Sequence, residues 1–394
     1  MRLDEGLDLI MEGLSNFHGR FKKMYGQIAL RLNDNEYLTS GDNKLLSGIN
    51  REDIQICDIT TGDLGQVFEK REDINVFLYA CNQDIVEVSN TVDALAPSLD
   101  DLAYITGASL RVIDSAAPSS ILDGIKNSGM CLVKGLGAFV ATSDMRQATT
   151  AMLVLEKSCE AYNHGNLIGG VKPIEKNTAR DLRSNYKNDY LSTNNQDIEY
   201  IEYDDAEIET RKQLVQFVEE LASIDLNYGS WGNVSVRSAE DEMLITPSAM
   251  EYDDVAYQDI VKVDIDTLEY DDPRVPSMDT PLHAKMYQEL PDCDAIIHTH
   301  SNGCSVFAAC EAGFAITDPA MHQLIGDIKV IPYSTDQSKL ADDIVATMQD
   351  THAAILAHHG AIFYGPSIES VFEIAKGVEQ MAQALLKYNP DDEA

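Results

Sequence analysis

Apolar and polar positions in the C-terminal half of the chain follow two repeating patterns, which predict short strands separated by amphipathic helices. Between residues 207 and 225 the apolar positions recur every three or four residues, as on a helix with one buried face. The buried faces predicted for this helix and for a closing helix over 368–386 consist of Leu214, Phe217, Val218 and Leu221, and of Val371, Ala375, Val378 and Met381. Other helices are predicted over 281–290 and 339–348, and strands over 232–237, 243–246, 260–264, 295–297, 328–332 and 353–356. Short strands flanked by helices predict a layered α/β domain with one buried sheet.

The N-terminal half contains similar runs in the same order, at an offset that rises from 206 to 223 residues. The matched pairs are 51–59 with 257–265, 110–113 with 328–331, and 137–140 with 360–363. We interpret the chain as a tandem repeat, since matches in a fixed order are rare by chance. Residues 1–162 and 206–394 are the predicted domains. The polar stretch 163–205 is predicted to be a linker with one short strand near 198–203.

The amino-acid composition argues against several classes of function. The 66 acidic and 29 basic residues give a formal net charge of −37, which repels phosphate backbones and anionic lipid, so nucleic-acid and membrane-surface partners are not expected. No uncharged apolar run approaches the ~18 residues of a membrane span, and the N-terminus lacks the pattern of a signal peptide. Seven cysteines without a CxxC motif indicate free thiols in a reducing compartment, and a cytoplasmic location is predicted.

Seven of the nine histidines lie in the second domain, and three of them predict a metal site. His298 and His300 end an apolar strand and project from the same side of it. His359 follows another apolar strand. Two such strand ends side by side could hold one ion with three imidazoles and leave a position open, as in a catalytic zinc site. Taken alone, an HxH pair is equally compatible with two ordinary strand-end histidines.

The other histidines are given structural roles. Strand alternation is expected to turn His358 away from His359, and His283, on a predicted helix, is expected to pack behind the site. His322 and His352 lie in no motif. Loops rich in small and hydroxyl residues, around Ser230, Ser248 and Ser277, offer donors for an anionic ligand. Each loop alone is weak evidence for a binding site, because such residues usually cap helices.

Five motifs stand in order: GSWGNVSVR (229–237), LITPS (244–248), VPSMDTPLH (275–283), IIHTHS (296–301) and HHG (358–360). Together they resemble the class II aldolase and adducin family over about residues 206–386. The resemblance implies two tandem three-layer αβα domains, each with a central β-sheet flanked by helices. In the first, the repeat is predicted to place Glu87, Ser89 and Leu136 where the second has its three histidines. The first domain is therefore expected to be a degenerate copy without metal ligands.

The resemblance also implies roles for individual residues. His298, His300 and His359 would hold one divalent metal, with zinc the expected ion, and Asp279 would act as general acid and base. The implied reaction is cleavage of a small sugar phosphate or related hydroxy-ketone through a metal-stabilised enediolate. Residues that match the family's phosphate-contacting positions are Ser230, Asn233, Ser248 and Ser277.

Two other functions stay open at this point. The Asp-Thr-Pro sequence at 279–281 is closer to the sugar-phosphate 4-epimerase branch, and a dehydratase or decarboxylase would use the same site. A non-enzymatic, adducin-like scaffold is the third hypothesis, which the degenerate first domain favours.

The sequence departs from the family pattern in three places. Met278 and Ala249 replace a serine and a glycine of the phosphate loops, and Arg237 is the single basic candidate for a phosphate clamp. Family members bring a catalytic tyrosine from a longer tail, whereas only 35 residues follow His359 here; Tyr388 is the candidate for that role, and a helix-end anchor is the alternative interpretation. An acid from residues 317–322 of an adjoining domain, with Asp318 the best candidate, could assist. Family members form fourfold rings. A tandem chain is therefore expected to form a homodimer that closes a pseudo-tetrameric ring, or a higher homo-oligomer.

Overall fold

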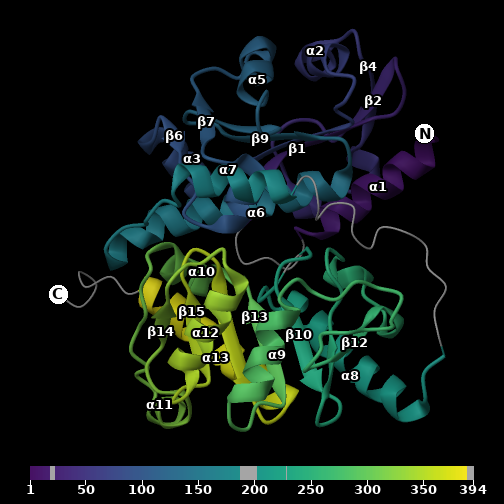
Figure 1. The fold of residues 1–394 in the computed structure, drawn as a ribbon. Helices are drawn as coiled ribbons and strands as arrows, with labels where there is room; N and C mark the ends of the chain where they lie inside the picture. The colour runs from purple at the N-terminus through teal and green to yellow at the C-terminus, as the bar shows by residue number, and fades with distance from the viewer. Residues whose placement is uncertain (18–22, 187–201, 228, 388–394) are drawn as a thin grey trace. The chain divides into compact units, whose positions relative to one another are not determined.

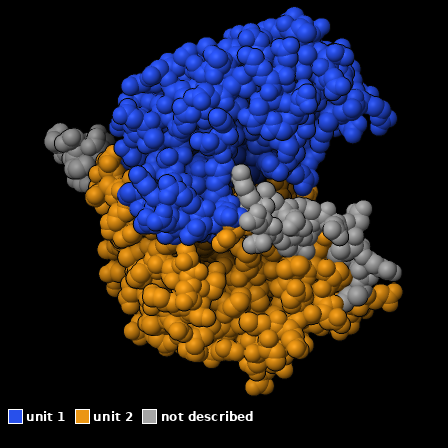
Figure 2. All heavy atoms as spheres, turned by 45° about the horizontal axis from the view of Figure 1, so that its top comes forward, with its two compact units in different colours: residues 1–163, 173–184 blue, residues 164–172, 185–394 orange. Residues whose placement is uncertain are grey.

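The chain folds into two compact units. The structure, a computed structural model, describes residues 1–17, 23–186, 202–227 and 229–387. Unit 1 comprises residues 1–163 and 173–184, and unit 2 comprises residues 164–172 and 185–394 (Figure 2).

Unit 1 contains a mixed sheet with helices on both faces (Figure 1). Its described helices are α1 (Leu3–Ser15), α2 (Gly62–Lys70), α3 (Gln83–Thr91), α4 (Asp100–Thr106), α5 (Pro118–Gly124), α6 (Met145–Gly165) and α7 (Lys176–Asn185). Its described strands are β1 (Tyr25–Arg31), β2 (Glu36–Thr39), β3 (Lys44–Leu45), β4 (Gln55–Asp58), β5 (Val76–Cys81), β6 (Ala94–Leu95), β7 (Leu110–Ile113), β8 (Met130–Val133) and β9 (Gly137–Thr142).

Unit 2 has the same architecture. Its described helices are α8 (Asp205–Ser223), α9 (Thr280–Glu289), α10 (Asn302–Ala309), α11 (Pro319–Ile325), α12 (Gln337–Met348) and α13 (Ile368–Lys387). Its described strands are β10 (Asn233–Arg237), β11 (Glu242–Ile245), β12 (Val261–Asp264), β13 (Ala295–Thr299), β14 (Lys329–Ile331), β15 (Ala353–Leu356) and β16 (Gly360–Gly365). Every helix and strand predicted for this half from the apolar pattern is present, within about two residues for most boundaries.

The two sheets have the same strand order, which confirms the tandem αβα fold. In unit 1 the order is β4-β2-β1-β5-β9-β8-β7, with β6 beyond β7 and β3 paired to β1. In unit 2 it is β12-β11-β10-β13-β16-β15-β14. In each sheet one pair of neighbouring strands is parallel: β7 with β8 in unit 1 and β14 with β15 in unit 2. The three runs matched in the sequence occupy equivalent strands: β4 and β12, β7 and β14, β9 and β16.

The register corrects one prediction about the first copy. Tyr79 pairs with Phe139 on β9, as His298 pairs with Ile362 on β16. Tyr79 and Cys81 therefore stand where unit 2 has His298 and His300, while Glu87 and Ser89 lie on α3, so their assignment was wrong. The offset between copies does not grow smoothly. It changes mainly at two loops of unit 2: residues 265–279 separate β12 from α9 whereas only residues 59–61 separate β4 from α2, and residues 332–352 separate β14 from β15 whereas residues 114–129 separate β7 from β8.

Helices cover both faces of the unit 2 sheet. Side chains of α9 and α12 pack in one buried cluster with β11, β12, β13, β15 and β16. Helix α13 packs against α10, against β13 and β16, and against α8, on the other face. The predicted face of α8 is buried throughout. The face of α13 is buried at Val371, Ala375 and Val378, whereas Met381 is only half-buried.

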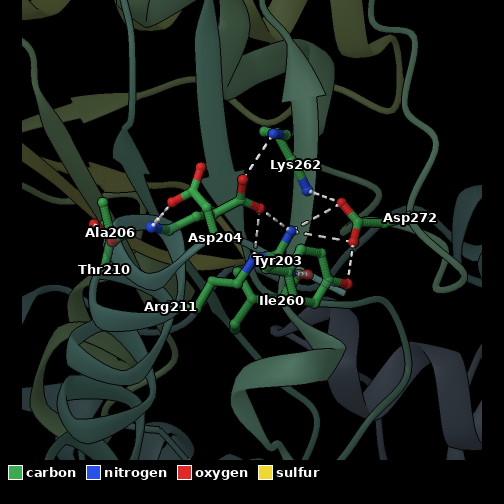
Figure 3. A network of polar contacts seen from close by, with 9 residues as sticks. Tyr203, Asp204, Ala206, Thr210, Arg211, Ile260, Lys262 and Asp272 are labelled. Carbon is green, nitrogen blue, oxygen red and sulfur yellow. Dashed lines mark hydrogen bonds and ion pairs between the residues drawn. The ribbon is translucent and has the colours of Figure 1, made fainter. Parts of the chain in front are cut away.

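A buried ionic network attaches α8 to the sheet edge (Figure 3). The Arg211 side chain is fully buried and pairs with Glu207 at 2.7 Å and with Asp272 at 3.1 Å. The ring of Tyr203 lies 3.7 Å from the guanidinium carbon. Lys262, on β12, binds Glu207 through Nζ at 2.8 Å and Asp272 through its backbone N–H at 2.6 Å. Each buried charge therefore has an opposite charge or a hydrogen-bond donor beside it.

The stretch predicted to be a linker is partly folded. Within residues 163–205 lies α7, which belongs to unit 1 and whose Arg183 donates to the carbonyl of Thr106 at 2.9 Å. Most of the strand predicted near 198–203 lies outside the described residues, and Glu202 and Tyr203 are in no strand. In the described part of the chain, none of the helices has the length and apolar character to span a membrane.

Candidate metal centre

Three imidazoles converge at one edge of the unit 2 sheet. The Nε2 atom of His298 lies 2.9 Å from Nε2 of His300 and 3.0 Å from Nε2 of His359. One ligand atom from each of the three lies within 4.8 Å of the others. His298 and His300 are buried and His359 is half-buried. The three histidines predicted from strand ends are therefore together in space.

The strands explain this convergence. His298 is the fourth residue of β13, and His300 follows the end of that strand with its side chain on the same side. His359 lies in the turn between β15 and β16, and β16 pairs with β13. Nδ1 of His298 is 3.0 Å from the carbonyl oxygen of Ala361. That contact assigns the proton to Nδ1, so Nε2 presents a lone pair to the other two rings.

Burial favours the neutral form of His298. Burial, and then the neighbouring His359, lower the pKa of His298 to about 3. Neutral imidazole is the form that binds a metal ion. Three imidazole rings whose nitrogens face one another, one of them oriented by a backbone carbonyl, fit a divalent cation such as zinc.

Asp279 lies beside the cluster with its carboxylate free of a capping role. It occupies the position before the first turn of α9, yet its side chain accepts no hydrogen bond from that helix. Instead Oδ2 accepts from Nδ2 of Asn233 at 2.7 Å. Burial alone would raise the pKa of Asp279, but the adjacent imidazoles of His298 and His359, together with the hydrogen bond from Asn233, lower it below its ordinary value. A half-buried carboxylate beside three imidazoles is suited to proton transfer.

Beneath Asp279 runs a buried hydrogen-bond chain that the sequence analysis did not find. The hydroxyl of Ser235 lies 2.7 Å from Nδ1 of His283 and 2.7 Å from the hydroxyl of Tyr287. His283 is fully buried, which lowers its pKa to about 4. The packing role expected for His283 is confirmed. The contacts of Ser235 with His283 and Tyr287 could not be predicted from the sequence, because only tertiary packing brings β10 against α9.

A buried carboxylate holds the turn after His300. Glu379, on α13, accepts from the hydroxyl of Ser301 at 2.7 Å and from the N–H groups of Gly303 at 2.7 Å and Cys304 at 2.9 Å. A β-carbon at residue 303 would lie 2.9 Å from this carboxylate, so glycine allows the approach. In unit 1, Glu156 accepts from Nδ2 of Asn82 at the equivalent turn, at 3.0 Å.

Two of the four residues predicted to bind phosphate contact Asp279. Asn233 contacts Asp279 directly, and the hydroxyl of Ser277 accepts from the N–H of Asp279 at 3.3 Å. The N–H of Ser248 donates to Val275 at 2.9 Å, so its loop lies against the loop of Ser277. Ser230 is half-buried in the loop before β10.

Two other residues proposed for the site from the sequence, Arg237 and Asp318, make contacts that stabilise the fold. The guanidinium of Arg237 donates to the carbonyl of Tyr287 at 2.6 Å and that of Glu240 at 2.6 Å, and stacks over the Tyr287 ring. It is therefore committed to the fold and not to a phosphate clamp. Asp318 caps α11 by accepting from the N–H of Met321 at 2.8 Å. Tyr388 lies outside the described residues.

The equivalent place in unit 1 has different chemistry. The Tyr79 hydroxyl donates to the carbonyl of Leu136 at 3.0 Å, in the positions of His298 and His359. Tyr79, Cys81 and Leu136 offer no imidazole. That unit 1 binds no metal stays a prediction, now for the corrected residues.

Both units match the same protein family. A family model described as the class II aldolase and adducin N-terminal domain matches residues 14–163 and 212–386. An L-fuculose phosphate aldolase of Haemophilus influenzae is 32% identical over 185 residues, which covers 45% of this chain and 83% of that protein. A 5-methylthioribulose-1-phosphate/5-deoxyribulose-1-phosphate aldolase of Rhodospirillum rubrum is 34% identical over 182 residues, covering 45% and 80%. A solved structure of an L-fuculose 1-phosphate aldolase is 29% identical and covers 45% of this chain and 84% of its own, with a TM-score of 0.43.

Proposed function

The chain belongs to the class II aldolase and adducin family, and from that premise we propose that unit 2 is a divalent-metal-dependent aldolase. Its substrate is a small sugar phosphate or a related hydroxy-ketone, in which a carbon–carbon bond is cleaved. The observation that carries the proposal is the convergence of three imidazole nitrogens beside the half-buried carboxylate of Asp279. The activities of the similar proteins, aldolases named for L-fuculose phosphate and for 5-methylthioribulose 1-phosphate and 5-deoxyribulose 1-phosphate, support the substrate class.

In this proposal His298, His300 and His359 hold the ion. When bound, the ion supplies Lewis-acid stabilisation of the negative charge that develops on the substrate oxygens. Asp279 holds and releases the proton that moves during cleavage, at its carboxylate oxygens. The amide of Asn233 orients that carboxylate through its 2.7 Å hydrogen bond. The other amide atom, Oδ1 of Asn233, is buried and has no hydrogen-bond partner among the described residues, so it can accept from a substrate hydroxyl.

The first test is metal content. We expect about one divalent ion per chain in desalted protein, measured by mass spectrometry, and loss of that ion in a His298→Ala variant. His322→Ala is the matched control, because that histidine is exposed and its nearest charged partner is Asp327 at 3.4 Å. A chain that binds no ion even after zinc is added would instead support the adducin-like scaffold.

The second test is the reaction. Ketose phosphates of different stereochemistry are incubated with the zinc-loaded chain, and released dihydroxyacetone phosphate and glycolaldehyde are measured. Formation of an epimer without cleavage products would favour the 4-epimerase alternative, which the aspartate at 279 followed by Thr280 and Pro281 suggests. If neither product forms from any sugar phosphate, both activities are wrong for this chain.

The quaternary structure proposed is a homodimer that closes a ring of four domains. Mass measurement of the native chain in solution tests it. A mass of one chain would overturn the ring.

A further inference from the structure

The turn that carries His359 contains a residue in a conformation that ordinarily favours glycine. His358 has a φ of +62°, in the left-handed region where a β-carbon crowds the following carbonyl oxygen. At the same turn, unit 1 has Gly135 with a φ of +67°. In both units the next residue closes the turn with an N–H···O=C bond, of 3.0 Å in unit 1 and 3.1 Å in unit 2. The fold therefore requires a left-handed residue here, and unit 2 has a histidine where glycine would be unstrained.

The His358 side chain is buried and makes contacts that glycine would lack. Its Nε2 lies 3.0 Å from Oε1 of Glu311, just beyond the end of α10. Its ring meets Tyr333 edge to face, with centroids 5.3 Å apart and an angle of 80°. Its backbone N–H donates to the carbonyl of Ala308 at 2.9 Å. The side chain thus connects the turn to the end of α10 and to the loop after β14.

Glu311 is itself held in place. Its Oε2 accepts from Nζ of Lys172 at 2.9 Å, and its backbone also lies in the left-handed region, with a φ of +51°. The pKa of Glu311 is lowered, first by the hydrogen bond from Lys172. An ionised and anchored carboxylate is a firm acceptor for an imidazole N–H.

We propose that His358 is a positioning residue, whose side chain, held by Glu311 and Tyr333, fixes the turn so that His359 presents its Nε2 toward His298. The inference rests on the proposed function, since it concerns the same three histidines. His358 acts through the backbone of the turn and does not touch the ion.

The test compares zinc affinity among three variants of the full chain. His358→Gly removes the side chain and keeps the left-handed backbone without strain. It is expected to weaken zinc binding about tenfold, as loss of a group supporting a ligand does, and to change the visible spectrum of the Co²⁺-loaded protein. Glu311→Ala is expected to have an effect of similar size, and the double variant is expected to be no weaker than either single variant, because both remove one contact. His352→Ala is the control, since His352 precedes the other end of β15 and packs on Tyr364.

The outcomes separate the two proposals. If His358→Gly binds zinc and gives the cobalt spectrum of the parent, the positioning role is wrong and the metal centre stands. If that variant does not fold, Glu311→Ala decides by the same measurements. A parent chain that binds no zinc overturns the proposed function and this inference together.

Discussion

The Arg211 network allows a prediction that needs no substrate. Changing Arg211 to alanine leaves two acidic side chains without their main counter-charge, and the side chain of Asp272 is only 4% exposed. Breaking a buried ion pair from one side costs about 3–5 kcal/mol, because the remaining charge stays desolvated. Glu207 keeps Lys262, and Asp272 keeps the hydroxyl of Tyr203 and the N–H of Lys262. We therefore expect a loss in the middle of that range, about 4 kcal/mol in the free energy of unfolding of unit 2.

The assay uses a property of the sequence. Trp231 is the one tryptophan of the chain, is buried in unit 2 and lies 5.8 Å from the ring of His300, centroid to centroid. Urea unfolding followed by its fluorescence therefore reports on unit 2. At about 2–4 °C per kcal/mol for a domain of this size, the thermal midpoint of unit 2 should fall by about 8–16 °C.

The control and the refuting result follow from the same geometry. The double variant Arg211→Met with Asp272→Asn removes both charges and should recover much of the loss. A loss below about 1 kcal/mol in Arg211→Ala would mean that water reaches Asp272 and that the network is only a surface feature. That result would refute the assignment of this network as the anchor of α8.

Three further predictions concern the candidate site. Asp279→Asn should keep its zinc and lower kcat by about 100-fold or more, measured as product release, because the proton-transfer group is lost. Asn233→Ala should lower kcat by about tenfold or more, since a hydrogen bond to a charged group contributes about 1.5–3 kcal/mol. If this variant instead raises KM alone, and only for phosphorylated substrates, Asn233 contacts the phosphate and does not orient Asp279. The metal-free parent should lose stability as pH falls from about 6.5 to 4, because buried His283 stays neutral with a pKa of about 4 while the unfolded chain takes up a proton. This histidine accounts for about 3 kcal/mol of that loss, so urea unfolding of His283→Asn should show a flatter pH profile, and an unchanged profile would contradict the assignment.

The elements predicted best from the sequence are those with one buried face. Helices such as α9 and α12 cover a sheet on one side and face water on the other, so the apolar spacing is visible in the sequence. Helix α10 was not predicted, since it is packed by α13 and by the sheet and is buried from Gly303 to Ala309. A helix buried all round has no polar face, and its short run of small and apolar residues shows no period.

The site was predictable only where local sequence determines side-chain direction. His298 and His300 share one strand, so their common orientation follows from the period of two. The hydrogen bonds of Asp279 with Asn233, and of His283 with Ser235, join residues 46 and 48 positions apart. Spacing along the chain carries no information about such contacts. The assignment of Glu87 in unit 1 failed for a related reason, because the long loop between β12 and α9 shifts the register abruptly at that point and not gradually along the chain.

Comparison of the two units within the chain separates what the fold requires from what the chemistry requires. The guanidinium of Arg31 donates to the carbonyl of Phe68 and stacks over its ring, as Arg237 does with Tyr287 at the same place in unit 2. Because unit 1 lacks the three histidines and keeps this arginine, the arginine serves the fold.

The opposite holds for groups found only in unit 2. At the offset that relates β13 to β5, Asp279 and His283 correspond to Thr60 and Leu64, and at the offset that relates β16 to β9, His358 corresponds to Gly135. Unit 1 thus forms its fold without an aspartate or a histidine at the first two positions, and glycine is less strained at the third. The loop over 265–279, which leads to Asp279, is also the segment by which unit 2 exceeds unit 1 before α9. A fold that forms without these groups gives no structural reason for them, so their presence in unit 2 is best explained by the chemistry of the three histidines that they accompany.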